Sequence, residues 1–136
     1  MALYIHLANM KKDIKKVGSG ELENKNFITS ALRGGFNRFP NKYAALKNAF
    51  VGRKKNKKTG RQAAHYKCAS CSKVFPSREI QVDHVNPVVD PEKGFINWDV
   101  YIDRMFCVVE NLQALCKVCH KRKTADERRA RAASKS

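Results

Sequence analysis

Residues 66–71 read YKCASC, and residues 115–120 read LCKVCH. Each stretch has two cysteines separated by two residues, and a C-x-x-C turn presents two thiolates at the separation that zinc requires. Two such turns supply the four ligands of a closed tetrahedral site. The sequence therefore predicts a structural zinc ion bound by Cys68, Cys71, Cys116 and Cys119. Since that site has no open position, its zinc would stabilise the fold and take no part in chemistry.

The cysteine content also indicates the cellular compartment. The chain has five cysteines, and its N-terminus lacks the order of charged and apolar residues that marks a secretory signal. We therefore expect reduced thiols and an intracellular protein, for which the alternative to zinc is a set of buried or redox-active thiols. Cys107 lies outside both pairs and is predicted to be a small buried residue. His65 could replace one ligand, but nothing requires it.

The net charge of the chain favours a polyanionic partner. The sequence has 28 Lys and Arg against 12 Asp and Glu, a formal net charge of +16. The acidic residues are concentrated between residues 79 and 110, so one acidic stretch lies between two basic ones. Basic surface next to carboxylates that can hold a cation suits a protein that acts on nucleic acid. The alternatives are charge that serves only solubility and a basic tail on an unrelated domain. No apolar run is long enough to cross a bilayer, so we expect no membrane partner.

The apolar periodicity predicts helices and short strands in an α+β arrangement. Helices are expected within residues 1–20, from about Asn26 to Arg33 before two glycines, from about Pro40, over 98–106 and over 117–132. Strands are expected at 80–85 and 112–115, joined by an irregular segment over 86–98. Residues 53–58 contain no apolar side chain, which predicts a solvated linker. We expect this linker to contact the DNA backbone through Arg53, Lys54, Lys55, Lys57 and Lys58.

Three polar features accompany the predicted zinc site. Asp83 and His84 are adjacent on the first of the two predicted strands. Asn111 precedes the second strand, and His120 follows Cys119 at the start of the last helix. Because zinc would join the two C-x-x-C turns, it would also bring His120 close to Asp83 and His84. Taken singly, each residue also has an ordinary structural interpretation, as part of a strand edge, a turn or a helix start.

The order of these residues resembles the motif of one nuclease family. Residues 83–87 read DHVNP and residues 110–124 read ENLQALCKVCHKRKT. Both are similar to HNH, or ββα-metal, endonucleases of the four-cysteine zinc type, which is found among bacteriophage and homing endonucleases. The similarity covers about residues 66–125. It implies a small ββα-metal core held by the four-cysteine zinc site. The charge and the apolar periodicity predict a basic, mainly helical segment before this core. We therefore expect a DNA-contacting segment at 1–60 and a nuclease domain at 61–136.

The resemblance also implies a role for each polar residue in the hydrolysis of DNA phosphodiester bonds. His84 would be the general base that deprotonates the attacking water. Asp83 and His120 would hold one divalent cation, which could be Mg²⁺, Mn²⁺, Ni²⁺ or Zn²⁺. The products would carry 5′-phosphate and 3′-hydroxyl ends.

The remaining motif residues would support this chemistry. Asn111 would brace the segment between the strands and orient His84, and Asn97 is an alternative for this role. Arg122 and Lys123, one turn into the last helix, would contact flanking phosphates. The sequence does not identify the side chains that would read bases.

Two other functions remain open at the level of sequence. A zinc knuckle on a basic protein can bind nucleic acid without cutting it. A small HNH protein can also act as a factor in phage DNA packaging. The expected partners are therefore DNA and, as alternatives or additions, a second copy of the chain or phage packaging proteins.

Overall fold

The structure is a computed structural model that describes residues 24–135. Contacts between Cα atoms divide the chain into two units, residues 1–35 and residues 36–136. The helix expected within residues 1–20 lies outside the described residues. The described part contains four α-helices and two small sheets, so the predicted α+β class is confirmed. None of the helices in residues 24–135 is both long enough and apolar enough to span a membrane.

Helix α2 (Lys25–Phe36) is longer than predicted. The prediction that it stops before Gly34 and Gly35 is wrong, because neither glycine takes a positive φ. A glycine inside a helix costs only about 1 kcal/mol relative to alanine. The helix ends instead shortly before Pro40, since the residue that precedes a proline disfavours the helical region. Phe39 accordingly has an extended backbone, with φ −69° and ψ 125°.

Helix α3 (Pro40–Ala49) begins at its proline, as predicted. A proline fits the first turn because its missing N–H would have no intrahelical partner there. Leu46 and Ala49 on this helix pack against the core of the second unit. The chain then enters a sheet without an intervening loop, since β1 starts at the next residue.

The first sheet contains three antiparallel strands in the order β1-β2-β3. Strands β1 (Phe50–Lys55) and β2 (Gln62–Lys67) form a hairpin, and β3 (Val74–Pro76) pairs with the end of β2. The basic residues at 53–58 are exposed, as predicted, but they lie in the end of β1 and the turn after it, so the prediction of a linker is wrong. Residues on both faces of this part of β1 are exposed, so the strand lacks the alternation of apolar and polar residues that would reveal it. The expected domain boundary at residues 60 and 61 falls inside this hairpin.

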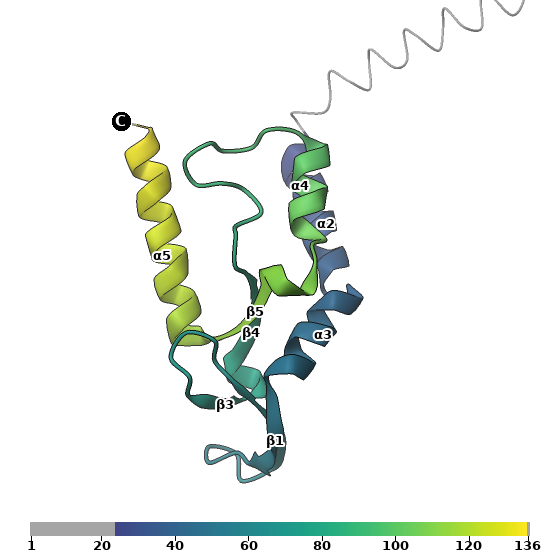
Figure 1. Ribbon diagram of the computed structural model, residues 1–136, viewed down its shortest axis with the longest axis vertical. Helices are drawn as coiled ribbons and strands as arrows, with labels where there is room; N and C mark the ends of the chain where they lie inside the picture. The colour runs from purple at the N-terminus through teal and green to yellow at the C-terminus, as the bar shows by residue number, and fades with distance from the viewer. Residues whose placement is uncertain (1–23, 136) are drawn as a thin grey trace, which may run out of the picture. The chain divides into compact units, whose positions relative to one another are not determined.

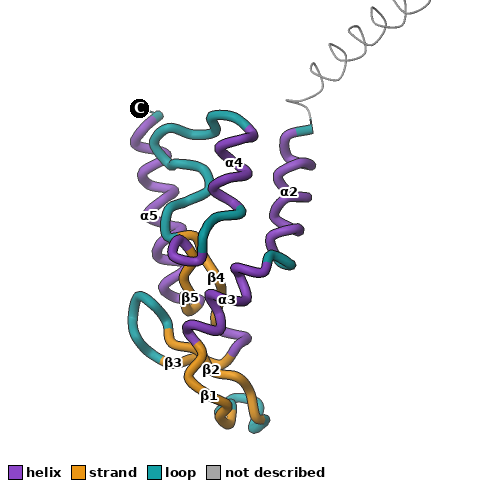
Figure 2. The backbone as a smooth tube through the Cα atoms, turned by 45° about the vertical axis from the view of Figure 1, so that its right-hand side comes forward, coloured by secondary structure: helices purple, strands orange, loops and turns teal. Residues whose placement is uncertain are grey.

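The second sheet pairs β4 (Ile80–His84) with β5 (Leu112–Cys116) in antiparallel register. Helix α5 (Lys117–Ser134) follows β5 directly, and Figures 1 and 2 show it continuing from the end of that strand. The predictions of two strands and a final helix are confirmed. Because Ile80 pairs with Cys116, α5 begins beside the first residue of β4.

A long connection joins β4 to β5. It contains an irregular segment, helix α4 (Trp98–Met105) and the short 3₁₀ turn η2 (Val109–Asn111). Helix α4 was predicted at this place. The Asn97 side chain caps it by accepting a hydrogen bond from the Val100 N–H at 2.8 Å. Phe95 and Trp98 pack edge to face, with ring centroids 4.9 Å apart, and this contact holds the irregular segment against the helix.

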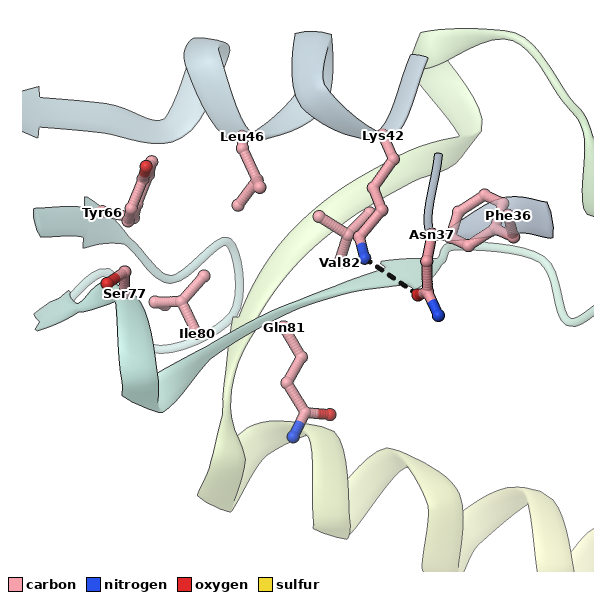
Figure 3. Close-up of a pocket in the computed structure, with 9 residues that line it drawn as sticks. All are labelled: Phe36, Asn37, Lys42, Leu46, Tyr66, Ser77, Ile80, Gln81 and Val82. Atoms are coloured by element: carbon pink, nitrogen blue, oxygen red, sulfur yellow. Dashed lines mark hydrogen bonds between the residues drawn. The ribbon is translucent and has the colours of Figure 1, made fainter. Parts of the chain in front are cut away.

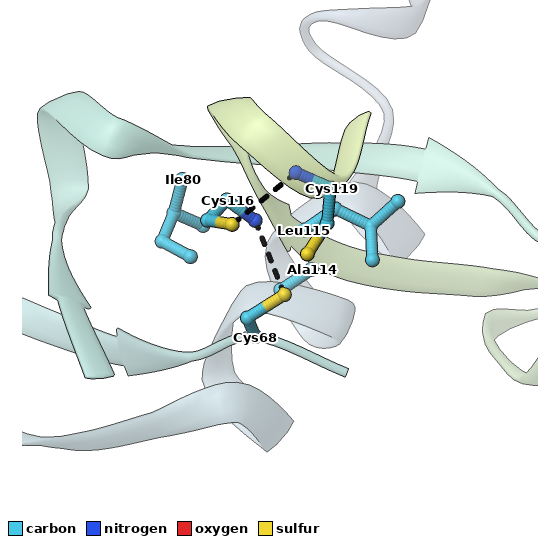
Figure 4. Packing of buried hydrophobic residues seen from close by; sticks show 6 residues of the cluster. All are labelled: Cys68, Ile80, Ala114, Leu115, Cys116 and Cys119. Carbon is cyan, nitrogen blue, oxygen red and sulfur yellow. Dashed lines mark hydrogen bonds between the residues drawn. The ribbon is translucent and has the colours of Figure 1, made fainter. Parts of the chain in front are cut away.

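The core of the second unit is small and contains sulfur. Its buried residues come from the turn after β2, from β4, from β5 and from α5: Cys68, Ile80, Ala114, Leu115, Cys116 and Cys119 (Figure 4). Few large apolar side chains are available to this core, and a small core alone rarely stabilises a fold. A bound metal at the cysteines would compensate for that shortage.

Candidate metal centre and polar site

The four paired cysteines come together as predicted. Their Sγ atoms all lie within 4.8 Å of one another, and Cys71 Sγ is 4.0 Å from Cys116 Sγ. Four thiolates around one zinc ion, each at 2.3 Å in a tetrahedron, would be separated by about 3.8 Å. The cluster therefore has the ligand number, ligand type and spacing for a structural metal ion such as zinc.

Backbone N–H groups point at the sulfur atoms of this cluster. Cys116 N donates to Cys68 Sγ, and Cys119 N donates to Cys116 Sγ, both at 3.4 Å (Figure 4). Burial disfavours the Cys68 thiolate, but hydrogen bonds from the backbone of Cys116, Cys71 and Ser70 outweigh it and lower the pKa of Cys68 to about 6. The shared hydrogen bond with Cys116, followed by burial, raises the pKa of Cys119 to about 11. The N–H groups that donate to Cys68 and Cys116 stabilise the thiolate form of these two residues, which is the form that a metal binds.

The cluster joins parts of the chain that are distant in sequence. Cys68 follows β2, whereas Cys116 ends β5 and Cys119 lies in the first turn of α5. A backbone hydrogen bond from Ala69 N to Ala114 O, at 2.8 Å, runs beside the cluster. His65 is not a member, since its Nδ1 lies 2.8 Å from Ala63 O. Cys107 lies outside the cluster and is only partly buried.

Asp83 and His120 form a second group of polar side chains. Asp83 Oδ1 and His120 Nε2 are 3.8 Å apart, and the two side chains are 18% and 34% exposed. They meet because α5 starts beside Ile80 and lies along β4. Two ligands bound at about 2.1 Å, with an angle of about 90° to 120° between them, would lie roughly 3.0–3.6 Å apart. The observed distance of 3.8 Å is slightly longer than that range.

A lysine ammonium lies against the same carboxylate. Lys123 Nζ is 2.9 Å from Asp83 Oδ2 and also pairs with Glu127. The contact between Lys123 and Asp83 is an ion pair. Asp83 Oδ2 is buried and has no hydrogen-bond partner among the described residues. Partial burial lowers the pKa of Lys123, but Glu127 and Asp83 outweigh it and raise that pKa above its usual value. Lys123 therefore carries its charge at neutral pH and holds the place next to Asp83.

The His84 ring is held by a helix end. Its Nε2 lies 2.8 Å from the carbonyl oxygen of Met105, the last residue of α4. A carbonyl only accepts hydrogen bonds, so we assign the hydrogen to Nε2, which leaves Nδ1 with its lone pair in the neutral ring. The ring also packs on Phe36, with centroids 4.8 Å apart. The carbonyls of a last helical turn have no intrahelical partner, which makes them available for such a contact.

Asn111 lies where it can brace the backbone that follows His84. Its Oδ1 accepts a hydrogen bond from Asn86 N at 3.0 Å, and its main-chain oxygen accepts one from Val85 N at 2.8 Å. Asn97 makes neither contact, because its side chain caps α4. The geometry favours Asn111 over Asn97 as the asparagine associated with His84.

The basic residues singled out from the sequence fall into two places. Arg53, Lys54, Lys55, Lys57 and Lys58 lie on the β1–β2 hairpin and are all exposed. Arg122 and Lys123 lie on α5, where Arg122 is exposed and Lys123 is paired as described above. The hairpin residues share one protruding element, which the sequence did not reveal.

A cavity of about 380 Å³ lies between α3 and β4, apart from these polar groups (Figure 3). Leu46, Ile80 and Val82 contribute to its lining. Lys42 is the charged residue of the lining, and its ammonium donates to Asn37 Oδ1 at 3.1 Å. Asp83, Asn111 and His120 do not line it. The polar group on β4 and α5 is therefore separate from this cavity.

Three residues of the site were missed by the sequence analysis. Met105 contributes only a backbone carbonyl and Phe36 only an apolar ring surface, and neither leaves a signal in the residue types. The pairing of Lys123 with Glu127 could have been found, because residues four apart on a helix face each other.

Comparisons with protein-family models, with curated proteins and with solved structures found no match for this chain.

Proposed function

We propose that this chain is a metal-dependent endonuclease of the HNH type, which hydrolyses DNA phosphodiester bonds and leaves 5′-phosphate and 3′-hydroxyl ends. One observation carries the proposal. Asp83 Oδ1 and His120 Nε2 approach to 3.8 Å although they are distant in sequence, and His84 is the next residue after Asp83 on the same strand. A hydrolase for phosphodiesters needs a base for water and positive charge for the phosphate, and these residue types provide for both.

His84 is the general base in this proposal. The hydrogen bond from Nε2 to the Met105 carbonyl fixes the ring orientation and the tautomer. Nδ1, which keeps its lone pair, is then the atom that accepts a proton from the attacking water. The contact with Phe36 limits rotation of the ring and so helps to keep Nδ1 in one direction.

Asp83 and His120 would hold a divalent cation, which when bound would neutralise charge on the scissile phosphate and the leaving 3′ oxygen.

Asn111, the remaining motif residue, acts through the backbone. Asn111 ties Val85 and Asn86 to the turn before β5, so that the end of β4 and the His84 side chain stay in place. It is therefore a positioning residue in this proposal.

The four cysteines would hold zinc as a structural ion. Their spacing leaves no place for a substrate ligand within a closed tetrahedral shell. Zinc there would fix the start of α5, and with it His120, against the turn that leads into β3 and β4. The proposed chemistry and the proposed stabilising metal are thus separate but mechanically linked.

A second candidate is a zinc-stabilised module that binds DNA without cutting it. The Lys123 ammonium at Asp83 favours this alternative, because it already neutralises the carboxylate that would hold a cation. Under this alternative, Asp83, Lys123 and Glu127 would form a structural ion network between β4 and α5.

Plasmid cleavage separates the two candidates. Supercoiled DNA is incubated with the zinc-loaded protein, with and without added Mg²⁺ or Mn²⁺, beside the variant His84→Ala. The nuclease proposal expects nicked or linear product that requires added cation and falls by about 100-fold or more in the variant. The control is Asn97→Ala, which removes a polar side chain from the connection after β4 and should cleave at the wild-type rate. Equal cleavage by wild type and His84→Ala, or binding without cleavage across several cations, would reject His84 as the base.

A further inference from the structure

The β1–β2 hairpin concentrates positive charge at its distal part. Residues 53–61, called the basic hairpin below, contain six basic and no acidic residues. All six are exposed: Arg53, Lys54, Lys55, Lys57, Lys58 and Arg61. Lys58 forms an ion pair with Glu79, at 2.6 Å, and among the described residues the other five have no ion pair. The hairpin therefore presents largely uncompensated charge to solvent.

The tip of the basic hairpin is held by internal hydrogen bonds. Asn56 is only 7% exposed; its N–H donates to Arg61 O, and its own carbonyl accepts from Gly60 N. The Asn56 Oδ1 accepts from Lys58 N at 2.9 Å. Gly60 has a φ of 75°, a left-handed conformation that favours glycine. These bonds fix the backbone from which the lysines project, which reduces the backbone entropy lost on binding.

The basic hairpin is a two-stranded ribbon that carries Lys and Arg side chains on both faces. Arg53 pairs with Ala64 and Lys54 pairs with Ala63, so small side chains stand opposite the long basic ones. Successive residues of a strand point to opposite faces, which puts Arg53 and Lys55 on one face and Lys54 on the other. A basic surface that lies flat on a polyanion needs cations on one face only. Cations on both faces and at the tip suit a ribbon that lies between two rows of phosphates.

The residue types of the hairpin also discriminate between nucleic acids. No aromatic residue occurs between residues 53 and 64, whereas single-strand binding relies on aromatic side chains that stack on bases. The major groove of A-form RNA is deep and narrow, whereas the B-form major groove is about 12 Å wide and admits a two-stranded ribbon. The observations therefore favour B-form duplex DNA.

The base and the tip of the hairpin are both tied to the polar site. Cys68 follows β2 directly and belongs to the cluster that also contains Cys119, one residue before His120. At the tip, the Lys58–Glu79 ion pair joins the hairpin to the 3₁₀ turn η1 (Ser77–Glu79), which leads into β4. A duplex held by the hairpin would thus be held in a fixed relation to Asp83 and His84.

We infer that the basic hairpin anchors the chain on B-form duplex DNA by entering the major groove and pairing its cations with phosphates on both sides. The inference deepens the proposed function, on which it rests for the choice of DNA as the polymer. The anchor supplies affinity and register, and the residues on β4 and α5 supply the chemistry.

The test compares two charge-matched variants of the full, zinc-loaded chain in the His84→Ala background. One replaces Arg53, Lys54, Lys55 and Lys57 by Gln, and the other replaces Arg38, Lys47, Lys73 and Lys135, which are exposed and lie outside the hairpin. Binding to a short labelled DNA duplex is measured by fluorescence anisotropy over a range of salt concentrations. We expect the hairpin variant to bind about 100-fold more weakly, with a slope of log K against log salt that is smaller by about 3 to 4. The control should stay within about threefold of the parent at low salt.

Two further measurements examine the mode of binding. Asn56→Ala keeps every charge but removes the acceptor at the tip, and we expect it to bind the duplex about fivefold more weakly. The parent should bind DNA duplex at least tenfold more tightly than a single strand or an RNA duplex of the same sequence. Equal losses in the two charge variants, or equal affinity for DNA and RNA duplexes, would overturn the inference. Zinc content and circular dichroism verify that each variant is folded.

Failure of this inference can be told apart from failure of the proposed function. If the wild-type chain cleaves plasmid but the hairpin variant binds like its parent, the anchor is wrong and the nuclease stands. If binding depends on the hairpin but no cation supports cleavage, the anchor stands and the nuclease is wrong.

Discussion

The four-cysteine cluster and the Asp83–His120 pair both have ligands for a cation, but they differ in closure. The cluster has four like ligands, three of them buried, and its sulfur atoms all lie within 4.8 Å of one another. The pair has two unlike ligands, is partly exposed and shares its carboxylate with Lys123. A closed shell can only stabilise, whereas an incomplete one leaves positions for water and substrate. Under the proposed function, the cluster would stabilise the small core and the pair would take part in the chemistry.

The largest expected effect is loss of the closed site. Cys68→Ser should reduce bound zinc from one per chain to none and abolish cooperative thermal unfolding, because structural zinc contributes about 10–16 kcal/mol in zinc-finger peptides. Metal analysis and circular dichroism check this. Cys107→Ser is the matched control, since Cys107 lies outside the cluster, and it should keep both the metal and the transition. A Cys68→Ser protein that retained one zinc and its Tm would show that the cluster is not the stabilising site.

A change at the Asp83–His120 pair should affect cleavage and leave the bound zinc in place. Asp83→Ala should lower the rate of plasmid cleavage by roughly a thousandfold, because it removes a ligand of the proposed cation. Its zinc content should be unchanged, because Asp83 lies outside the four-cysteine cluster. Wild-type cleavage by this variant, or loss of zinc together with cleavage, would remove the distinction between the two sites.

The ammonium at the open site should compete with a cation. Lys123→Met removes a positive charge 2.9 Å from Asp83 Oδ2. In the wild type, that ammonium would repel a divalent cation bound at Asp83. We expect the affinity for Mn²⁺, measured by electron paramagnetic resonance on the zinc-loaded protein, to rise by about tenfold, which is ~1.4 kcal/mol. Arg122→Met, on the same helix but directed to solvent, serves as the control. An unchanged or weaker Mn²⁺ affinity would mean that Lys123 does not limit access to Asp83.

The smallest expected effect concerns the two asparagines of the connection. Asn97→Ala should cost about 1 kcal/mol of stability, the usual value of a helix N-cap, without changing the cleavage rate. Asn111→Ala should cost a similar amount and also lower cleavage, because the backbone after His84 loses its acceptor. Chemical denaturation together with plasmid nicking measures both quantities. If Asn97→Ala lowered cleavage more than Asn111→Ala did, the assigned roles would have to be exchanged.

The sequence by itself predicted the elements that depend on local patterns. The C-x-x-C spacing fixed which four cysteines meet, because each pair is held by a single turn. The alternation of apolar and polar residues identified β4, and Pro40 marked the start of α3. The hairpin was missed because both faces of β1 are solvated beyond Gly52, so its strand has no hydrophobic period to detect.

The tertiary structure alone decided how the polar residues are paired. The sequence predicted that His120 would approach Asp83, but not that Lys123 would occupy the same carboxylate. It also could not show that a backbone carbonyl of Met105 holds His84, because every residue carries such a carbonyl and only the fold selects one. Residue types therefore determined which chemistry is available to this chain. The contact with the Met105 carbonyl determined which ring nitrogen of His84 keeps its lone pair. The position of α5 beside β4 placed the Lys123 ammonium next to Asp83.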